Sequence, residues 1–178
     1  FVVRCWLSVV ASVLSRAAGR PQSVPHAGDR APAHAGSFYP EQPSTLKAAI
    51  DGFLRDAVLQ RVPDARVLVV PHAGIVYSGQ IAADAFAQTR GQAIDTVVIL
   101  GANHTGPFAR ASVYDGERWQ TPLGSVAVDR ALAETIVDAG IGAVFDRARH
   151  EREHSIEVQV PFIQVLHPSA SIVPIVIG

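Results

Sequence analysis

The sequence contains a single cysteine, Cys5, and no methionine among its 178 residues. A lone cysteine excludes an intrachain disulfide and a cysteine-based zinc site, and such sparse use of cysteine is typical of a reducing compartment. No apolar run approaches the roughly 18 residues that cross a bilayer. We therefore expect a cytoplasmic protein that does not insert into a membrane.

An excess of charge of either sign is also missing, since 15 lysines and arginines stand against 16 acidic residues. Such a balance provides no summed field to attract nucleic acid or an anionic membrane surface. Glycine-rich nucleotide motifs, phosphate loops and the GxSxG motif of serine hydrolases are absent from the sequence as well. We therefore expect a small-molecule or peptide ligand at a local site, with neither nucleic acid nor membrane as a partner.

The length and an apolar content of 48% suit one hydrophobic core and one domain. We expect residues 1–30 to be a disordered N-terminal extension or linker, although residues 1–20 also have the apolar, acid-free composition of a targeting segment. Residues 31–178 are expected to form the domain. Because the sequence starts at Phe1 and contains no methionine, we expect its natural start to be absent. Because it stops directly after the strand-like "SIVPIVI", we also expect a chain truncated at its C-terminus.

Hydrophobic periodicity predicts the elements of an α/β domain. The expected helices are 44–60 (capped by Ser44), 79–88, 129–139 and 153–167, the last kinked at Pro161; the expected strands are 66–70, 95–100 and 171–177, with a hairpin over 111–120 around Asp115-Gly116. Strands 66–70 and 95–100, joined by a helix, should lie parallel and adjacent. The predicted fold is a mostly parallel sheet flanked by helices.

The tetrapeptide "PHAG" occurs twice, at 25–28 and 71–74. The first copy follows no strand, so we interpret it as a turn. The second follows the predicted strand 66–70 and contains His72, while His104 in "LGANHTG" follows the predicted strand 95–100. Ligands collect at the carboxyl ends of parallel strands, and imidazole nitrogens bind iron, copper or zinc. His72 and His104 are therefore candidate metal ligands, with ordinary turn residues as the alternative.

A third candidate segment is "EREHSIE", which contains His154 and Glu157. In a helix these two residues would share a face and could supply a carboxylate ligand, an acid–base pair or support for the ligands. The alternative is a solvated, charged helix start. We assign His154 and Glu157 as candidate catalytic residues, and interpret His150 and His167 as surface residues.

Six segments, in order, resemble the Memo-like family, also called AmmeMemoRadiSam system protein B. They are "HAGSFYP" (34–40), "VVPHAGIVYSG" (69–79), "ILGANHTG" (99–106), "TPLG" (121–124), "EHSIEVQVPF" (153–162) and "IVPIVIG" (172–178). The resemblance covers residues 31–178 and ends near the middle of a typical member. It implies a fold similar to class III extradiol dioxygenases, with Fe²⁺ held by His72, His104 and a third ligand expected beyond residue 178.

Three functions remain open at this point. The first is a dioxygenase-like non-haem iron oxidoreductase, with Cu or Zn as alternative metals. The second is a non-catalytic module that binds a peptide or small ligand in the same crevice, because a fold does not confer a reaction. The third is a metal hydrolase, which would need zinc and a nearby carboxylate such as Glu157.

Overall fold

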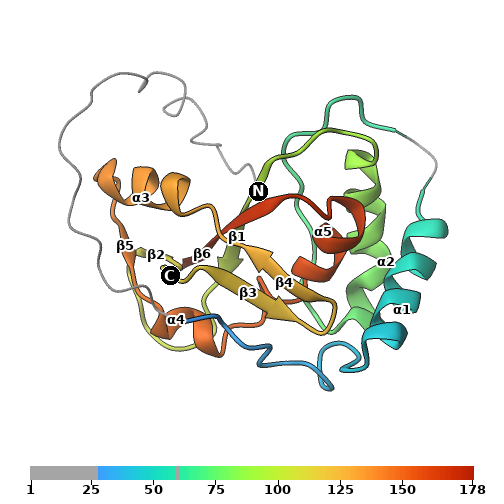
Figure 1. Cartoon of the computed structure of the whole chain (residues 1–178), viewed down its shortest axis with the longest axis horizontal. Coiled ribbons are helices and arrows are strands. Elements are labelled where there is room, and N and C mark those ends of the chain that lie inside the picture. Colours follow the sequence, from blue (N-terminus) through green and yellow to red (C-terminus); the bar gives the residue numbers. More distant parts are fainter. Residues whose placement is uncertain (1–27, 59–60) are drawn as a thin grey trace.

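The computed structural model describes residues 28–58 and 61–178. The predicted extension therefore lies outside the described residues except for its last three, and so does most of the first "PHAG". The elements in chain order are α1 (Pro43–Arg55), α2 (Ile75–Phe86), the 3₁₀ turn η2 (Ala87–Thr89), β1 (Thr96–Ala102), β2 (Ala111–Val113), β3 (Arg118–Thr121), β4 (Gly124–Ala127), α3 (Arg130–Asp138), β5 (Ala143–Phe145), α4 (Ala148–Glu151), α5 (Val160–Leu166) and β6 (Ser171–Ile177) (Figure 1).

The central sheet has four strands in the order β1-β6-β2-β5. β6 runs parallel to β1 over its whole length, from Thr96 opposite Ser171 to Ala102 opposite Ile177, and antiparallel to β2; β2 is parallel to β5. The inner position of β6 follows from its composition, because a nearly continuous apolar run suits a strand buried on both faces. The mostly parallel α/β sheet predicted from the sequence is thus confirmed.

Helices cover both faces of this sheet (Figure 1). On one face, Ile172 and Val176 of β6 belong to the main core, which also contains buried residues of α1, α2 and α5. On the other face, Val173 and Ile175 pack with Ala133 of α3. The alternation along β6 therefore divides the core into two layers, of which the layer with α1, α2 and α5 is the larger.

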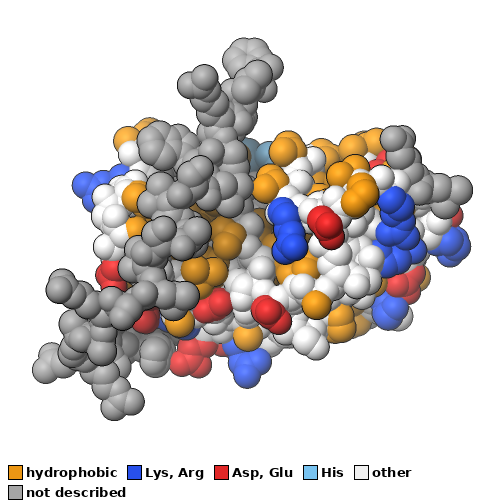
Figure 2. Space-filling view, turned by 90° about the horizontal axis from the view of Figure 1, so that it is seen from above, with side chains coloured by type: hydrophobic (Ala, Val, Ile, Leu, Met, Phe, Trp, Pro, Cys, Tyr) orange, Lys and Arg blue, Asp and Glu red, His pale blue; other side chains and the backbone are white. Residues whose placement is uncertain are grey.

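The predicted strand 66–70 is wrong. The segment lacks strand structure, and although Leu68 and Val70 pack against the main core, Val67 and Val69 are 60% and 93% exposed. Among the described residues, β1 pairs with β6 alone, so no ladder joins it to 66–70. Apolar composition identified a segment that touches the core, but a strand also needs backbone partners. Exposed hydrophobic side chains are not confined to this segment, since several are visible on the face of the molecule shown in Figure 2.

The predicted hairpin over 111–120 is also wrong, since its two strands belong to different sheets. β2 pairs with β6 and β5, whereas β3 forms a separate antiparallel hairpin with β4 across the "TPLG" turn. Between β2 and β3 the chain buries Tyr114, whose ring meets the buried Trp119 edge-on at 5.4 Å. Burial of these two rings and the pairing of β2 with β6 outweigh the local preference of Asp-Gly for a hairpin.

The helix predictions are confirmed in kind and corrected at their ends. α1 begins at Pro43 with Gln42 as its cap rather than Ser44, because proline suits the first position of a helix. α2 begins at Ile75, directly after the second "PHAG". The helix predicted over 153–167 starts only at Val160, so Pro161 lies in its first turn instead of kinking it. His154 and Glu157 consequently lie in a turn and not on a helical face.

His150 and His167 are both buried, so the prediction that they lie on the surface is wrong. The ring of His150 packs against those of Tyr114 and Trp119, with Nε2 3.1 Å from the Ser112 hydroxyl. Burial lowers the pKa of His150 to about 4, and its hydrogen bond to the Ser112 backbone acts in the opposite direction. The imidazole is therefore neutral in the folded protein at physiological pH.

This buried imidazole predicts a pH-dependent stability. The unfolded chain takes up a proton at His150 near pH 6.5 and the folded protein only near pH 4, so the stabilisation is complete above pH 6.5 and is lost as the pH falls to 4. We expect the wild type to lose about 3 kcal/mol more unfolding free energy over this window than His150→Phe, measured by urea denaturation. Parallel pH profiles for the two proteins would contradict the prediction.

Candidate metal centre

His72 lies in the loop between the extended segment 66–70 and α2. The Gln159 side-chain amide donates to the Pro71 carbonyl at 3.0 Å, and the Ile75 N–H at the start of α2 donates to the Phe38 carbonyl at 2.8 Å. A side chain at Gly74 would come within 3.3 Å of that same carbonyl. The "PHAG" loop is therefore fixed at both ends by contacts to distant parts of the chain.

His104 follows the carboxyl end of β1, which ends at Ala102. The Asn103 side chain shapes this turn: its carbonyl oxygen accepts from the Thr105 N–H at 3.0 Å and its amide donates to the Gly106 carbonyl at 2.6 Å. Gly106 has φ of +119°, a conformation that favours glycine. Asn103 and Gly106 thus turn the chain at the end of β1 and place His104 beyond the edge of the sheet.

His154 comes from the turn between α4 and α5. The Ser155 hydroxyl fastens this turn to the end of β1 by donating to the Ala102 carbonyl at 3.0 Å. The close approach requires a glycine at position 101, because a Cβ there would lie 2.5 Å from the side chains of Ser155 and Ile156. The segment that carries His154 is thereby brought against the strand that leads to His104.

The three histidines form one cluster. A ring nitrogen from each of His72, His104 and His154 lies within 4.8 Å of the other two. Ring centroids are 4.2 Å apart for His104 and His154, 5.3 Å for His72 and His104, and 5.8 Å for His72 and His154. The meeting of His72 and His104 agrees with the sequence-based expectation, and His154 is a member of the same group.

Two further aromatic rings border the cluster, and neither was expected from spacing or periodicity. The ring centroids of Phe38 and His154 are 4.6 Å apart, and those of His34 and His154 are 5.6 Å apart. His34 is held by its Nε2, which is 2.9 Å from the Arg152 carbonyl. Both residues occur in the "HAGSFYP" segment, so the family motif was the one signal for them. They form an aromatic wall on one side of the histidines.

Glu153 is the main electrostatic partner of the cluster, and its side chain is fully buried. Burial acts to raise the pKa of Glu153, but hydrogen bonds from the Ser155 N–H and from His104 act in the opposite direction and bring it to about 2. Burial lowers the pKa of His154; the Glu153 carboxylate opposes this, and the imidazoles of His104, His34 and His72 add to it. The cluster therefore combines an ionised carboxylate with a histidine that favours its neutral, metal-binding form.

Glu157 has different partners. Its carboxylate forms an ion pair with Arg30 at 2.6 Å and accepts from the N–H groups of Ala33 and His34 at 3.1 and 2.8 Å and from the Tyr39 hydroxyl. Both charged side chains are buried. This arrangement joins the N-terminal segment to the turn that carries His154. The catalytic assignment of Glu157 stays a prediction, while its contacts are those of a residue that holds the wall in place.

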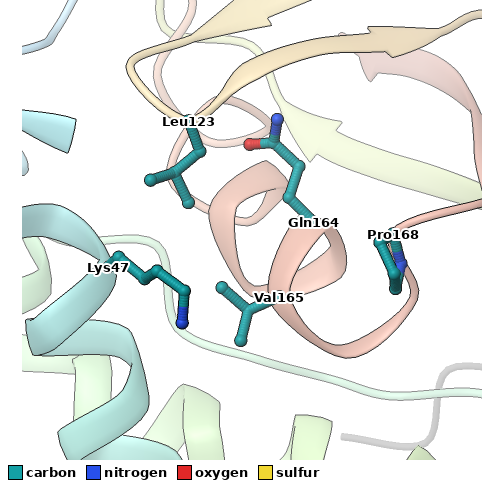
Figure 3. A pocket seen from close by; sticks show the side chains of 5 residues that line it. All are labelled: Lys47, Leu123, Gln164, Val165 and Pro168. Atoms are coloured by element: carbon teal, nitrogen blue, oxygen red, sulfur yellow. The ribbon is translucent and has the colours of Figure 1, made fainter. Parts of the chain in front are cut away.

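A hollow of about 330 Å³ lies apart from the histidines, lined by Lys47, Leu123, Gln164, Val165 and Pro168 (Figure 3). The polar groups at its edge already have partners, since the Gln164 amide bonds to Thr121 and Gly124 and Lys47 binds Asp51 at 2.7 Å. It therefore offers no free polar group for a ligand.

Among the described residues, 28–58 and 61–178, each helix is too short or too polar to span a bilayer.

The fold and the cluster together define an α/β domain with a candidate three-histidine metal centre at the carboxyl end of β1. A family model described as "Memo-like protein" matches residues 30–178, and the chain belongs to this family. The resemblance noted in the sequence is thereby confirmed. The match begins at the buried Arg30, one residue before the predicted domain boundary.

Curated relatives agree with this assignment, and each is described as a "MEMO1 family protein". The relative from Methanobrevibacter smithii is 40% identical over 160 residues, covering 84% of this chain and 57% of its own. The relative from Sulfolobus acidocaldarius is 42% identical, covering 83% and 57%, and that from Thermococcus onnurineus is 43% identical, covering 84% and 53%. The chain thus spans little more than half the length of these relatives.

Proposed function

We propose that His72, His104 and His154 bind one divalent transition metal ion, with Fe²⁺ as the first candidate, and that the domain supports dioxygenase-like redox chemistry. The observation that carries the proposal is the convergence of three imidazole nitrogens within 4.8 Å from three separate loops. Imidazole is a preferred ligand of iron, copper and zinc. His154, first assigned to catalysis, becomes the third ligand in this proposal, in place of a residue beyond position 178.

The donor set fits such an ion on chemical grounds. Metal binding requires unprotonated imidazole, and the lowered pKa of His154 favours that form. The His104 side chain is 42% exposed, which leaves a path from solvent, whereas that of His154 is 17% exposed against the Phe38 ring. A bound Fe²⁺ would supply Lewis acidity and one-electron redox chemistry. The protein would orient the ligands and limit access of water on the side of the wall.

The hydrolase alternative has less support, because it needs a carboxylate free to act on water. Glu157 is engaged with Arg30 and Tyr39, and Glu153 with His104. In the non-catalytic binding module, any metal is structural or absent, and no reaction follows from it. Metal binding and oxygen uptake together therefore separate the two remaining functions.

The test is a titration of metal-free protein with Fe²⁺ under anaerobic conditions, and with Co²⁺, followed by calorimetry and absorption spectroscopy. We expect one equivalent to bind, and His72→Ala, His104→Ala and His154→Ala each to weaken binding by more than the roughly 10–100-fold typical of losing an outer partner of a ligand. His167→Gln, which alters a buried histidine bonded to Thr89 at 2.8 Å, is the matched control and should bind normally.

Two results would overturn the proposal: a wild-type protein that binds no metal, or binding that survives each of the three alanine substitutions. Dioxygenase-like chemistry is tested separately, by oxygen uptake of the iron-loaded protein with a panel of catechols. Histidine-dependent metal binding without any oxygen uptake would retain the metal site and reject this reaction class.

A further inference from the structure

The Glu153 carboxylate contacts both loops of the cluster that lie at the end of β1. Oε2 accepts from the His104 backbone N–H at 2.7 Å, and Oε1 lies 2.9 Å from His104 Nδ1. Oε1 also accepts from the backbone N–H groups of His154 and Ser155, each at 2.8 Å. One buried side chain thus bonds to the backbones of two cluster histidines and to the ring of one of them.

These bonds determine which ring nitrogen of His104 carries its proton. All three backbone partners of the carboxylate are donors, and an ionised carboxylate only accepts. His104 Nδ1 must therefore donate, which leaves the lone pair of Nε2 available. A histidine that donates one N–H to a carboxylate has its ring orientation and tautomer fixed for metal binding through the other nitrogen.

The glutamate is itself anchored from behind. The guanidinium of Arg30 donates to the Glu153 carbonyl at 2.9 Å and to the His150 carbonyl at 2.6 Å. The backbone of this turn is therefore fixed independently of the carboxylate. Replacing the side chain should alter the ligands without releasing the whole segment.

We propose that Glu153 is the positioning residue of the metal centre, which holds His104 as its Nδ1–H tautomer and sets the spacing between His104 and His154. This inference rests on the proposed metal site, but the tautomer can be measured without metal. Glutamine is the informative replacement, because it preserves volume while placing an NH₂ group where one carboxylate oxygen was. With the NH₂ in the place of Oε2, it would face the backbone N–H of His104, donor against donor. With the NH₂ in the place of Oε1, it would face His104 Nδ1 and favour the other tautomer, against the N–H groups of His154 and Ser155.

The experiment uses ¹⁵N-histidine-labelled, metal-free protein at pH 8, with the ring tautomers read by long-range ¹H–¹⁵N NMR and His104 assigned by its absence from His104→Gln. We expect the Nδ1–H form in the wild type and a mixture of tautomers in Glu153→Gln. In Co²⁺ and Zn²⁺ competition titrations, Glu153→Gln should bind about 10–100-fold more weakly. Glu151→Gln is the control, because it removes a 61%-exposed carboxylate two residues away that pairs with Arg147 at 3.9 Å.

The outcomes separate the two proposals. A wild type in which His104 is the Nε2–H tautomer overturns the positioning role, and so does equal metal affinity in wild type and Glu153→Gln. A wild type that binds no metal rejects the metal site, while the tautomer spectra still decide the role of Glu153. Should Glu153→Gln fail to fold, Glu153→Asp serves instead, because it retracts the carboxylate by one methylene and should show the same losses.

Discussion

Gly101→Val is expected to destabilise the protein by about 3 kcal/mol or more, at the upper end of the cost of overpacking a core. The added Cβ would lie 2.5 Å from Ile156 Cγ1 and from the Ser155 hydroxyl, and the two branch methyls would add to the conflict. Ile156 is completely buried and has no room to retreat. Relief therefore requires the turn that carries His154 to move away from β1.

Thermal and urea unfolding measure the loss, and Co²⁺ affinity of the folded fraction measures the displacement of His154. Gly52→Val on α1 is the matched control: apart from the backbone of its own helix, a Cβ there would approach only the flexible Arg55 Nη2, at 3.7 Å. Helix propensity does not oppose that change, so its stability should stay within about 0.5 kcal/mol of the wild type. Equal stability of the two variants would show that β1 and the 155–156 turn pack less closely than described.

The proximity of His72 and His104 was predictable from local sequence because each histidine is preceded by an extended apolar segment and surrounded by turn residues. Pro71 and Gly74 flank His72, and Asn103 and Gly106 flank His104. These residues mark where the chain leaves the core, whether or not the preceding apolar segment is a strand. The prediction of proximity therefore held even though residues 66–70 do not form the expected strand.

Pairing between distant segments was not predictable in the same way. β1 pairs with β6, and β2 also pairs with β6 instead of forming the expected hairpin. Periodicity indicates which side chains face the core, but it does not say which strand supplies the backbone partner. The same limit explains the error at 153–167, where Pro161 lies in the first turn of a helix because the preceding turn is held by contacts to β1.

The support of the site was the least predictable part. Glu153 and Glu157 are neighbours in one charged segment, and a charged helix start was a reasonable interpretation of it. Their roles differ because the turn directs Glu153 toward His104 and Glu157 toward Arg30. Only the backbone path separates them, and that path depends on a close approach at Gly101 about fifty residues away in sequence.

Arg30→Met is the second substitution with a large expected effect. It removes the partner of Glu157 at 2.6 Å and leaves a carboxylate buried without its counter-charge, which typically costs 3–5 kcal/mol. It also removes the donors to the carbonyls of His150 and Glu153 and the guanidinium that lies 4.1 Å from the Trp119 ring centroid. We expect a loss of about 3–5 kcal/mol in urea denaturation.

The double variant Arg30→Met/Glu157→Gln isolates the charge effect, because it no longer buries an unpaired carboxylate. It should recover part of the lost unfolding free energy. The rest should stay lost, because the carbonyls of the 150–153 turn remain without their donor. Arg55→Met is the surface control, since the Arg55–Asp56 pair is 73% and 64% exposed and should contribute at most about 1 kcal/mol. A double variant as unstable as Arg30→Met would show that the unpaired carboxylate contributes little, and would assign the loss to the carbonyl contacts and to the packing of the guanidinium on Trp119.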